Sequence, residues 1–273
     1  MELPWFGARK LWIKQFCTQH EKFIVSYVLP WAVILCNSLS AVTGVISYNG
    51  VSRAIFTTHP IEKPYLIYQI GSADPDLAVQ AAQTVMQDVS GIDLNCGCPK
   101  PFSTHAGMGA ALLTNPDLLC SILTALRREM PAHITVTAKI RLLPSQEDTL
   151  KLVERIVNTG ISALTVHCRT RNMRDKDKAL VERLREIVKF VEEMGKGTAV
   201  IENGDCIGWE DAKRVRAVTG AHSVMIARGA ESNPSCFSPS PLKDVERTLW
   251  PSYLRLVCIS VLRLLSCVHF WRF

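Results

Sequence analysis

Residues 91–100 read GIDLNCGCPK, a short apolar strand that runs directly into a polar turn. Asn95 follows the expected strand, and Gly97 and Pro99 then bracket Cys98. Because both bracketing residues favour turns, we expect them to hold the Cys98 thiol at the end of the strand. A structural cysteine would more often lie within the strand. The pattern is therefore typical of a functional thiol, with a simply buried free cysteine as the equal alternative.

The sequence on both sides of this stretch repeats the same unit. Between Ile61 and Pro234, short β-branched runs alternate with longer amphipathic stretches, which predicts βα units and a parallel sheet. The expected strands are Tyr65–Ile70, Gly91–Leu94, Ile134–Ile140, Ala163–His167, Ala199–Glu202 and Ser223–Ala227. Polar caps followed by proline open helices at Asp74 and Asn115, and further helices are expected over Gln146–Thr159, Lys178–Met194 and Trp209–Val218.

Six consecutive βα units fit either an open doubly wound sheet or a (β/α)₈ TIM barrel that lacks two units at its start. A barrel enzyme carries its functional groups where the strands end. Polar residues or glycines lie at the end of all six expected strands or directly after it, namely Gln69, Asn95 with Cys98, Lys139 with Arg141, His167 with Arg169, Asn203 with Gly204, and Arg228 with Gly229. Any one of these has a plain explanation as an exposed strand end, but six in succession indicate a shared pocket.

Glycines follow the last two expected strands, in IENGD and MIARGA. In barrels, the loops after strands seven and eight often bind a phosphate through backbone N–H groups. Gly204 and Gly229 therefore predict a phosphate-bearing ligand. Each could alternatively be a turn residue alone.

Composition narrows the class of protein only slightly. The formal net charge of +6 would help a polyanion approach, although so small an excess decides nothing. The 10 cysteines are scattered and no N-x-S/T acceptor occurs, which indicates a reducing compartment and free thiols. Cys96 and Cys98 lack a second pair at metal-site spacing, so we expect no metal site.

The two ends of the chain differ from its middle. No charged residue occurs from Phe23 to Ser52, so a membrane span or a signal-like segment comes into question, but Pro30 and the polar run NSLS weaken both ideas. The C-terminal stretch LVCISVLRLLSCVHFWRF is also apolar but is interrupted by Arg263. A buried or poorly specified tail is the preferred interpretation, and membrane attachment is not expected.

The motifs together resemble those of the tRNA dihydrouridine synthases, with a spacing most similar to the eukaryotic group that modifies the D-loop uridine at position 20. The matching stretches are YQIGSADP, GIDLNCGCPK, AGMGAALL, TAKIRLLPS, LTVHCRTR, IENGD and VMIARGAESNP, about two thirds of the chain. The resemblance divides the chain into an apolar segment outside the family pattern (1–44), an FMN-binding barrel (45–238) and a truncated or divergent helical tail (239–273).

The resemblance implies a chemistry in which NADPH reduces bound FMN and hydride then passes from the flavin to C6 of uridine. It makes Cys98 the general acid that protonates C5 from the opposite face, so its thiol must stay protonated until the transfer. It implies FMN contacts from Gln69, Lys139, His167, Asn203, Gly204, Asp205, Ala227 and Arg228. Asn95, Arg141 and Arg169 are implied contacts of the substrate.

A tRNA substrate sets two further expectations. The uridine must leave its stack to enter the pocket. The basic run from Arg169 to Lys178 could hold backbone phosphates, with a solvated loop as the equal alternative. The resemblance also implies a cytoplasmic protein, with the nucleus as an additional location.

Parts of the family pattern are missing. The first strand with its Pro-Met pair and the second βα unit are not recognisable before Val45, and Cys96, Cys168 and Asp205 replace residues that are more usual in the family. We therefore hypothesise an impaired product, since a barrel without two strands has open edges. Two other readings stay open: an FMN barrel acting on a small molecule, and a truncated fragment with weak RNA affinity.

Overall fold

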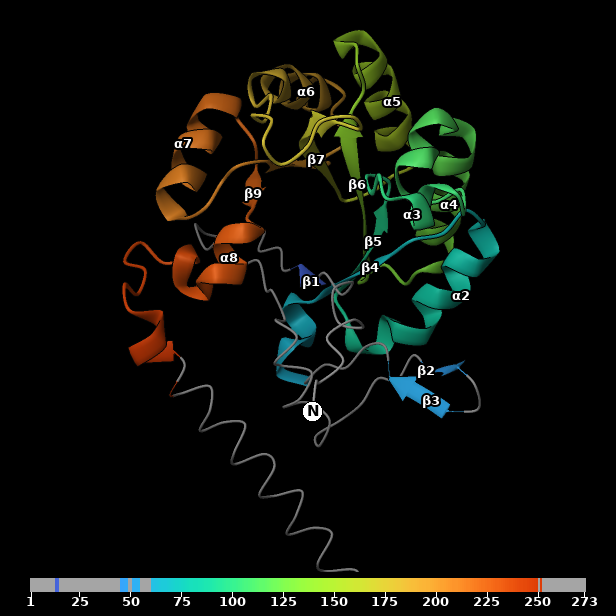
Figure 1. Ribbon diagram of the computed structural model, residues 1–273. Coiled ribbons are helices and arrows are strands. Elements are labelled where there is room, and N and C mark those ends of the chain that lie inside the picture. The colour runs from blue at the N-terminus through green and yellow to red at the C-terminus, as the bar shows by residue number, and fades with distance from the viewer. Residues whose placement is uncertain (1–12, 15–44, 49–50, 55–59, 250, 252–273) are drawn as a thin grey trace, which may run out of the picture.

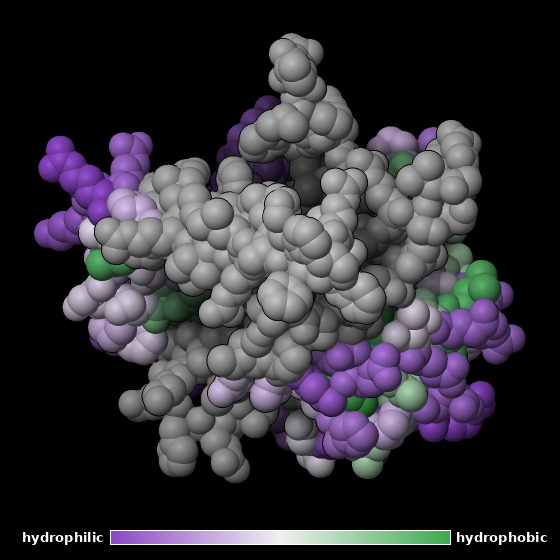
Figure 2. All heavy atoms as spheres, turned by 90° about the horizontal axis from the view of Figure 1, so that it is seen from below, coloured by the Kyte–Doolittle hydropathy of each residue, from purple (hydrophilic) through white to green (hydrophobic). Residues whose placement is uncertain are grey.

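The computed structural model describes residues 13–14, 45–48, 51–54, 60–249 and 251. The expected apolar segment 1–44, apart from residues 13–14, and the whole apolar C-terminal stretch 256–273 therefore lie outside the described residues. Within the described part of the chain, no helix is both long and apolar enough to cross a membrane. Figure 2 shows the molecule from below the view of Figure 1. The described residues visible on this face are largely hydrophilic, with small separate hydrophobic areas.

A parallel sheet forms the centre of the fold. Its six strands are neighbours in the order of the sequence, as expected from successive right-handed βα units. They are β4 (Ile67–Ile70), β5 (Gly91–Asn95), β6 (Thr135–Leu142), β7 (Ala163–Thr170), β8 (Ala199–Asn203) and β9 (Ser223–Met225). Each coincides with a predicted strand to within a few residues.

The long helices cover only the outer face of this curled sheet (Figure 1). They are α2 (Pro75–Val85), α4 (Pro116–Glu129), α5 (Gln146–Asn158), α6 (Glu182–Glu193) and α7 (Trp209–Thr219). A doubly wound sheet would carry helices on both faces, whereas a barrel carries them outside. The predicted α/β fold of the barrel type is thus confirmed, as an arc of six parallel strands.

The described arc departs from the barrel pattern at β4, its first parallel strand. Here β1 (Ile13–Lys14) pairs antiparallel with β4, whereas all strands of a (β/α)₈ barrel are parallel. A separate antiparallel pair is formed by β2 (Val45–Tyr48) and β3 (Val51–Ala54). The described strands therefore agree with a barrel that lacks its first two βα units.

Short helical turns connect these elements. They are η1 (Pro60–Tyr65), η2 (Met86–Asp88), α3 (Pro101–Thr104), η3 (Gly109–Thr114), α8 (Arg228–Ser232) and η4 (Pro234–Phe237). The predicted caps are confirmed, since Asp74 accepts a hydrogen bond from the Leu77 N–H at 2.8 Å and Asn115 accepts one from the Leu118 N–H at 3.2 Å.

Helix α6 begins later than the predicted start at Lys178. The Ala179 N–H donates to the Asp205 carboxylate at 2.8 Å, and the Leu180 N–H donates to the Cys168 carbonyl at 2.6 Å. These tertiary hydrogen bonds keep the segment before Glu182 out of the helix.

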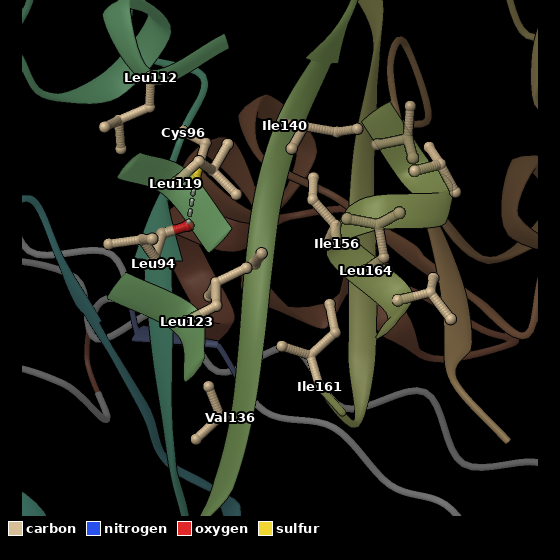
Figure 3. Close-up of a cluster of buried hydrophobic side chains, with 14 of the residues drawn as sticks. Leu94, Cys96, Leu112, Leu119, Leu123, Val136, Ile140, Ile156, Ile161 and Leu164 are labelled. Atoms are coloured by element: carbon tan, nitrogen blue, oxygen red, sulfur yellow. Dashed lines mark hydrogen bonds between the residues drawn. The ribbon is translucent and has the colours of Figure 1, made fainter. Parts of the chain in front are cut away.

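The two faces of the sheet have different chemistry. Alternate residues such as Leu94, Val136 and Leu164 point outward and pack against Leu119 and other helix residues, forming the main core (Figure 3). The residues between them include Asp93, Asn95, Thr137, Lys139 and His167, and by the alternation of strand side chains these face the inside of the arc. The fold thus separates an apolar helix-facing layer from a polar inner face.

Candidate active site

A cavity of about 710 Å³ lies at the carboxyl ends of the six parallel strands. This volume is in the range of small-molecule and cofactor sites. The cavity is lined by every residue that the sequence indicated as catalytic, cofactor-binding or substrate-binding: Gln69, Asn95, Cys98, Lys139, Arg141, His167, Arg169, Asn203, Gly204, Asp205, Ala227 and Arg228. The structure therefore brings the predicted set together.

Cys98 is half-buried at the cavity wall, in the turn after β5. The Asn95 side-chain oxygen accepts hydrogen bonds from the N–H groups of Gly97 (3.0 Å) and Cys98 (3.1 Å). Gly109, at φ +61°, packs so closely beneath Cys98 that an added Cβ would lie 2.7 Å from the Cys98 carbonyl oxygen. The backbone that carries the thiol is thus fixed from both sides.

Arg141 ties this turn to the neighbouring strand. Its Nε donates to the Gly97 carbonyl at 2.8 Å, and its Nη1 donates to the Thr170 carbonyl at 3.1 Å. Desolvation and the nearby Arg169 lower the pKa of Arg141 from its usual value. Lys139 lies two residues before Arg141 on β6, directly opposite Asn95 of β5.

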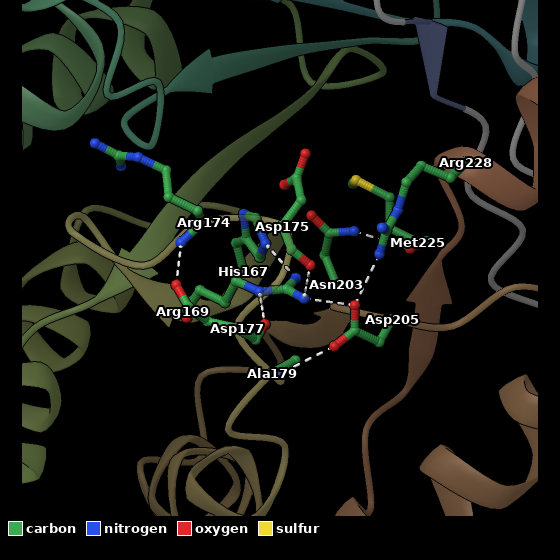
Figure 4. A network of polar contacts seen from close by, with 10 residues as sticks. All are labelled: His167, Arg169, Arg174, Asp175, Asp177, Ala179, Asn203, Asp205, Met225 and Arg228. Carbon is green, nitrogen blue, oxygen red and sulfur yellow. Dashed lines mark hydrogen bonds and ion pairs between the residues drawn. The ribbon is translucent and has the colours of Figure 1, made fainter.

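A second polar group is organised around Asp205 (Figure 4). Its Oδ1 accepts from Arg169 at 2.5 Å and from Arg228 at 2.8 Å, and its Oδ2 accepts from the Ala179 N–H. Desolvation alone would raise the pKa of this carboxyl, but these hydrogen bonds and the two guanidinium charges outweigh it and lower the pKa. Asp205 therefore holds three chain segments together at the cavity wall.

Arg169 is buried, and its guanidinium is committed to contacts within the chain. It donates to the Asp177 carbonyl at 2.7 Å and lies 3.3 Å from Nε2 of His167, in addition to Asp205. Arg169 therefore lines the cavity with its guanidinium held by its neighbours, which it orients in turn. The exposed members of the basic run are Arg171, Arg174, Lys176 and Lys178.

His167 is neutral in this environment. Desolvation, followed by the charges of Lys139, Arg141, Arg169 and Arg228, lowers its pKa to about 2. Since a guanidinium only donates, Nε2 must accept from Arg169, which assigns the ring proton to Nδ1. His167 can therefore offer an N–H to a ligand but cannot act as a cationic acid near neutral pH.

The loops after β8 and β9 pack against each other. Asn203 donates to the Met225 carbonyl at 3.0 Å. A Cβ on Gly229 would lie 2.0 Å from the Ile207 carbonyl oxygen, so the first turn of α8 approaches the β8–α7 loop as only glycine permits. Gly229 is thus required by the packing of these two loops, and it does not line the cavity.

Several residues of this region were not indicated by the motifs. Lys100, Phe102, Met108 and Asp175 also line the cavity. Below it lies Asp93, whose signal is a charged residue inside an apolar strand. Among the described residues, no three His, Cys, Asp or Glu side chains are grouped to hold a metal ion.

An arc of parallel strands with helices outside and a polar cavity at the strand ends defines a protein of the α/β-barrel class with a ligand site. Comparison with protein families matches residues 35–258 to Dihydrouridine synthase (Dus). The chain belongs to the dihydrouridine synthase family.

Curated relatives agree with this assignment. The tRNA-dihydrouridine(20) synthase [NAD(P)+] of Schizosaccharomyces pombe is 52% identical over 188 residues, which cover 68% of this chain and 39% of the relative. The enzyme of the same name from Saccharomyces cerevisiae is 41% identical over 202 residues, or 72% of this chain and 52% of the relative. The chain thus spans about half or less of the length of these relatives. A solved DHODH structure from Eimeria tenella, covering 57% of this chain and 49% of its own, has a TM-score of 0.44 at 15% identity.

Asp205→Ala should lower the free energy of unfolding by about 2 kcal/mol, since Arg169 stays buried without its carboxylate while the partial exposure of Asp205 limits the loss. The melting temperature, measured by thermal unfolding, should fall by about 4–8 °C. Because the folded pKa of Asp205 is lowered, this contribution is present above the ordinary value of 3.8 and fades at more acid pH.

Two variants control for this experiment. Asp205→Asn keeps a side chain that tolerates the left-handed φ of 57°, so its free energy of unfolding should fall less than that of Asp205→Ala. Glu210→Ala breaks a largely exposed ion pair with Lys213 and should change stability little. Equal losses for Asp205→Ala and Glu210→Ala would contradict the role given to Asp205.

Proposed function

We propose that this chain carries the catalytic barrel of an enzyme that reduces a uridine in the tRNA D-loop to 5,6-dihydrouridine, with FMN as the cofactor and NADPH as the electron donor. Family membership and the names of the relatives support the substrate class and the nicotinamide donor. The observation that carries the proposal is the placement of Cys98, Lys139 and His167 on the wall of one cavity.

The residues present fit a flavin mononucleotide. Lys139 supplies a positive charge next to His167, whose Nδ1–H is available to a ring acceptor. Gln69 would contact the ring from the end of β4. Arg228 and the closely packed loops at Asn203, Gly204, Asp205 and Ala227 suit its phosphate and ribityl chain. When bound, the flavin would supply hydride to the uracil ring.

The chain itself supplies the proton. In this proposal the Cys98 thiol donates a proton to C5 of uracil, and the fixed backbone from Asn95 to Gly97 sets its direction. His167 is unsuited to that role, because its imidazole is neutral at physiological pH. Lys139 remains near the ring as a fixed charge, which would stabilise negative charge on a reduced flavin.

The tRNA would be held by residues around the cavity mouth. Asn95, Arg141 and Arg169 line the cavity and are the candidate contacts of the uridine, and Arg169 also contacts His167. Arg171, Arg174 and Lys176 are exposed on the following loop, and in this proposal they would contact backbone phosphates. The base would enter the cavity unstacked from its neighbours.

The test uses the purified chain and unmodified tRNA. We expect flavin to copurify, NADPH to bleach its absorbance, and mass spectrometry to find dihydrouridine in the tRNA. Bound flavin with turnover of a small molecule alone would support the alternative oxidoreductase. Salt-sensitive tRNA binding without flavin would support the truncated-fragment reading, and either result would overturn the proposal.

A further inference from the structure

Asp93 is a buried carboxylate in the middle of β5, beneath the cavity. Its exposed fraction is 0%, and it does not line the cavity. Its Oδ2 accepts a hydrogen bond from Gln69 Nε2 at 2.5 Å and its Oδ1 accepts one from Thr137 Oγ1 at 2.7 Å. The three residues are direct neighbours across β4, β5 and β6. Asp93 thus lies at the centre of a polar row one layer below Asn95 and Lys139.

One branch of this row leads to the proposed proton donor. Gln69 Oε1 accepts from Asn95 Nδ2 at 3.2 Å. The oxygen of Asn95 in turn accepts from the N–H groups of Gly97 and Cys98. The contacts therefore form a continuous series from Asp93 through two side-chain amides to the backbone of Cys98.

The chemistry of the carboxylate fixes the direction of this series. A carboxylate accepts and does not donate, so Gln69 must turn its NH₂ group toward Asp93. Its oxygen then faces Asn95, which must present its own NH₂ group to Gln69. That orientation leaves the Asn95 oxygen toward the two N–H groups of the cysteine turn. The Asp93 carboxylate at one end and the two backbone N–H groups at the other thus require the same orientation of both amides.

We propose that Asp93 is a positioning residue that holds the Cys98 turn in place by orienting the Gln69 and Asn95 amides. The proposal rests on the proposed function only in taking Cys98 as the proton donor. A purely structural role would require no particular orientation of Gln69, and an apolar residue would avoid the desolvation of a buried carboxylate. The contacts instead continue into the cavity wall.

The experiment compares Asp93→Leu, Asp93→Asn and Thr137→Val in the full chain. Asn can still turn an oxygen toward Gln69, whereas Leu offers no acceptor. Thr137→Val removes the hydrogen bond to the other carboxylate oxygen and leaves the Gln69 branch in place. The first readout is the rate of iodoacetamide alkylation of Cys98, followed by peptide mass spectrometry without flavin or tRNA.

We expect Asp93→Leu to accelerate alkylation of Cys98, because the turn loses the hold of Asn95. In the tRNA assay its kcat should fall about 10- to 100-fold with little change in KM, as expected for a displaced reacting group. Asp93→Asn should restore most of both properties. Thr137→Val should lower the melting temperature but leave alkylation close to that of the unchanged protein.

Two outcomes would overturn the proposal: equal alkylation rates in Asp93→Leu and Thr137→Val, or an Asp93→Asn protein as impaired as Asp93→Leu. If the unchanged chain forms no dihydrouridine, the proposed function fails, but the alkylation series still tests the control of Cys98 by Asp93.

Discussion

Cys98→Ala should reduce dihydrouridine formation by about 10²- to 10⁴-fold, the range typical of removing a positioned general acid. Flavin content and melting temperature should stay close to those of the unchanged chain, because the thiol is half-buried at the cavity wall and its turn is held by the backbone. The neutral His167 cannot replace the missing proton donor near neutral pH. Single-turnover oxidation of prereduced flavin by tRNA measures the step directly.

Cys120→Ala is the matched control, since Cys120 is a half-buried cysteine on α4 that does not line the cavity. Its activity should equal that of the unchanged chain. A Cys98→Ala protein with nearly full activity would assign the proton to another group. Loss of flavin from the variant would instead show that the thiol matters for binding.

The architecture and the membership of the site were largely predictable from local patterns. Each parallel strand is a short apolar run, and its polar end marks the cavity edge, so Lys139 and His167 could be placed without a structure. This succeeds because parallel strands put all their carboxyl ends on one face. The contacts that each site residue makes within the chain were harder to predict from the sequence. Arg169, predicted to contact the substrate, is also paired with Asp205, 36 residues later, and no local pattern encodes that pair.

Two acidic residues inside apolar strands show what the sequence could still have revealed. Asp93 in GIDLN precedes the cavity residue Asn95 by two positions, so its side chain lies on the same inner face. There it accepts hydrogen bonds from Gln69 and Thr137. Glu202 in AVIEN precedes the cavity residue Asn203 by one position, so it faces the helix layer. Its two carboxyl oxygens are buried, and no described residue forms a hydrogen bond with either of them. The alternation of side chains along a strand thus puts Asp93 on the polar inner face, where it is hydrogen-bonded, and Glu202 on the apolar helix-facing side, where it is not.

Glu202→Gln should therefore raise the free energy of unfolding near pH 8. Desolvation, with the charge of Asp205 as the next cause, raises the pKa of Glu202 from 4.5 to about 8. The folded chain then binds one proton more than the unfolded chain between these values, so stability falls as pH rises through this window. The slope is at most about 1.4 kcal/mol per pH unit, and we expect a total of about 3 kcal/mol because buried sites relax on ionisation.

Denaturant unfolding of both proteins between pH 4.5 and pH 9 measures this difference. The two curves should nearly meet at pH 4.5, where Glu202 is protonated when folded and Gln is its neutral isostere, and should separate up to about pH 8. Glu154→Gln changes an exposed carboxylate on α5 and should follow the unchanged chain at every pH. Parallel curves for Glu202→Gln and the unchanged chain would mean that Glu202 is ionised in the fold and has a partner. The separation is expected because, among the described residues, no hydrogen bond reaches either Glu202 oxygen, and desolvation outweighs the charges of Lys139, Arg169 and Arg214.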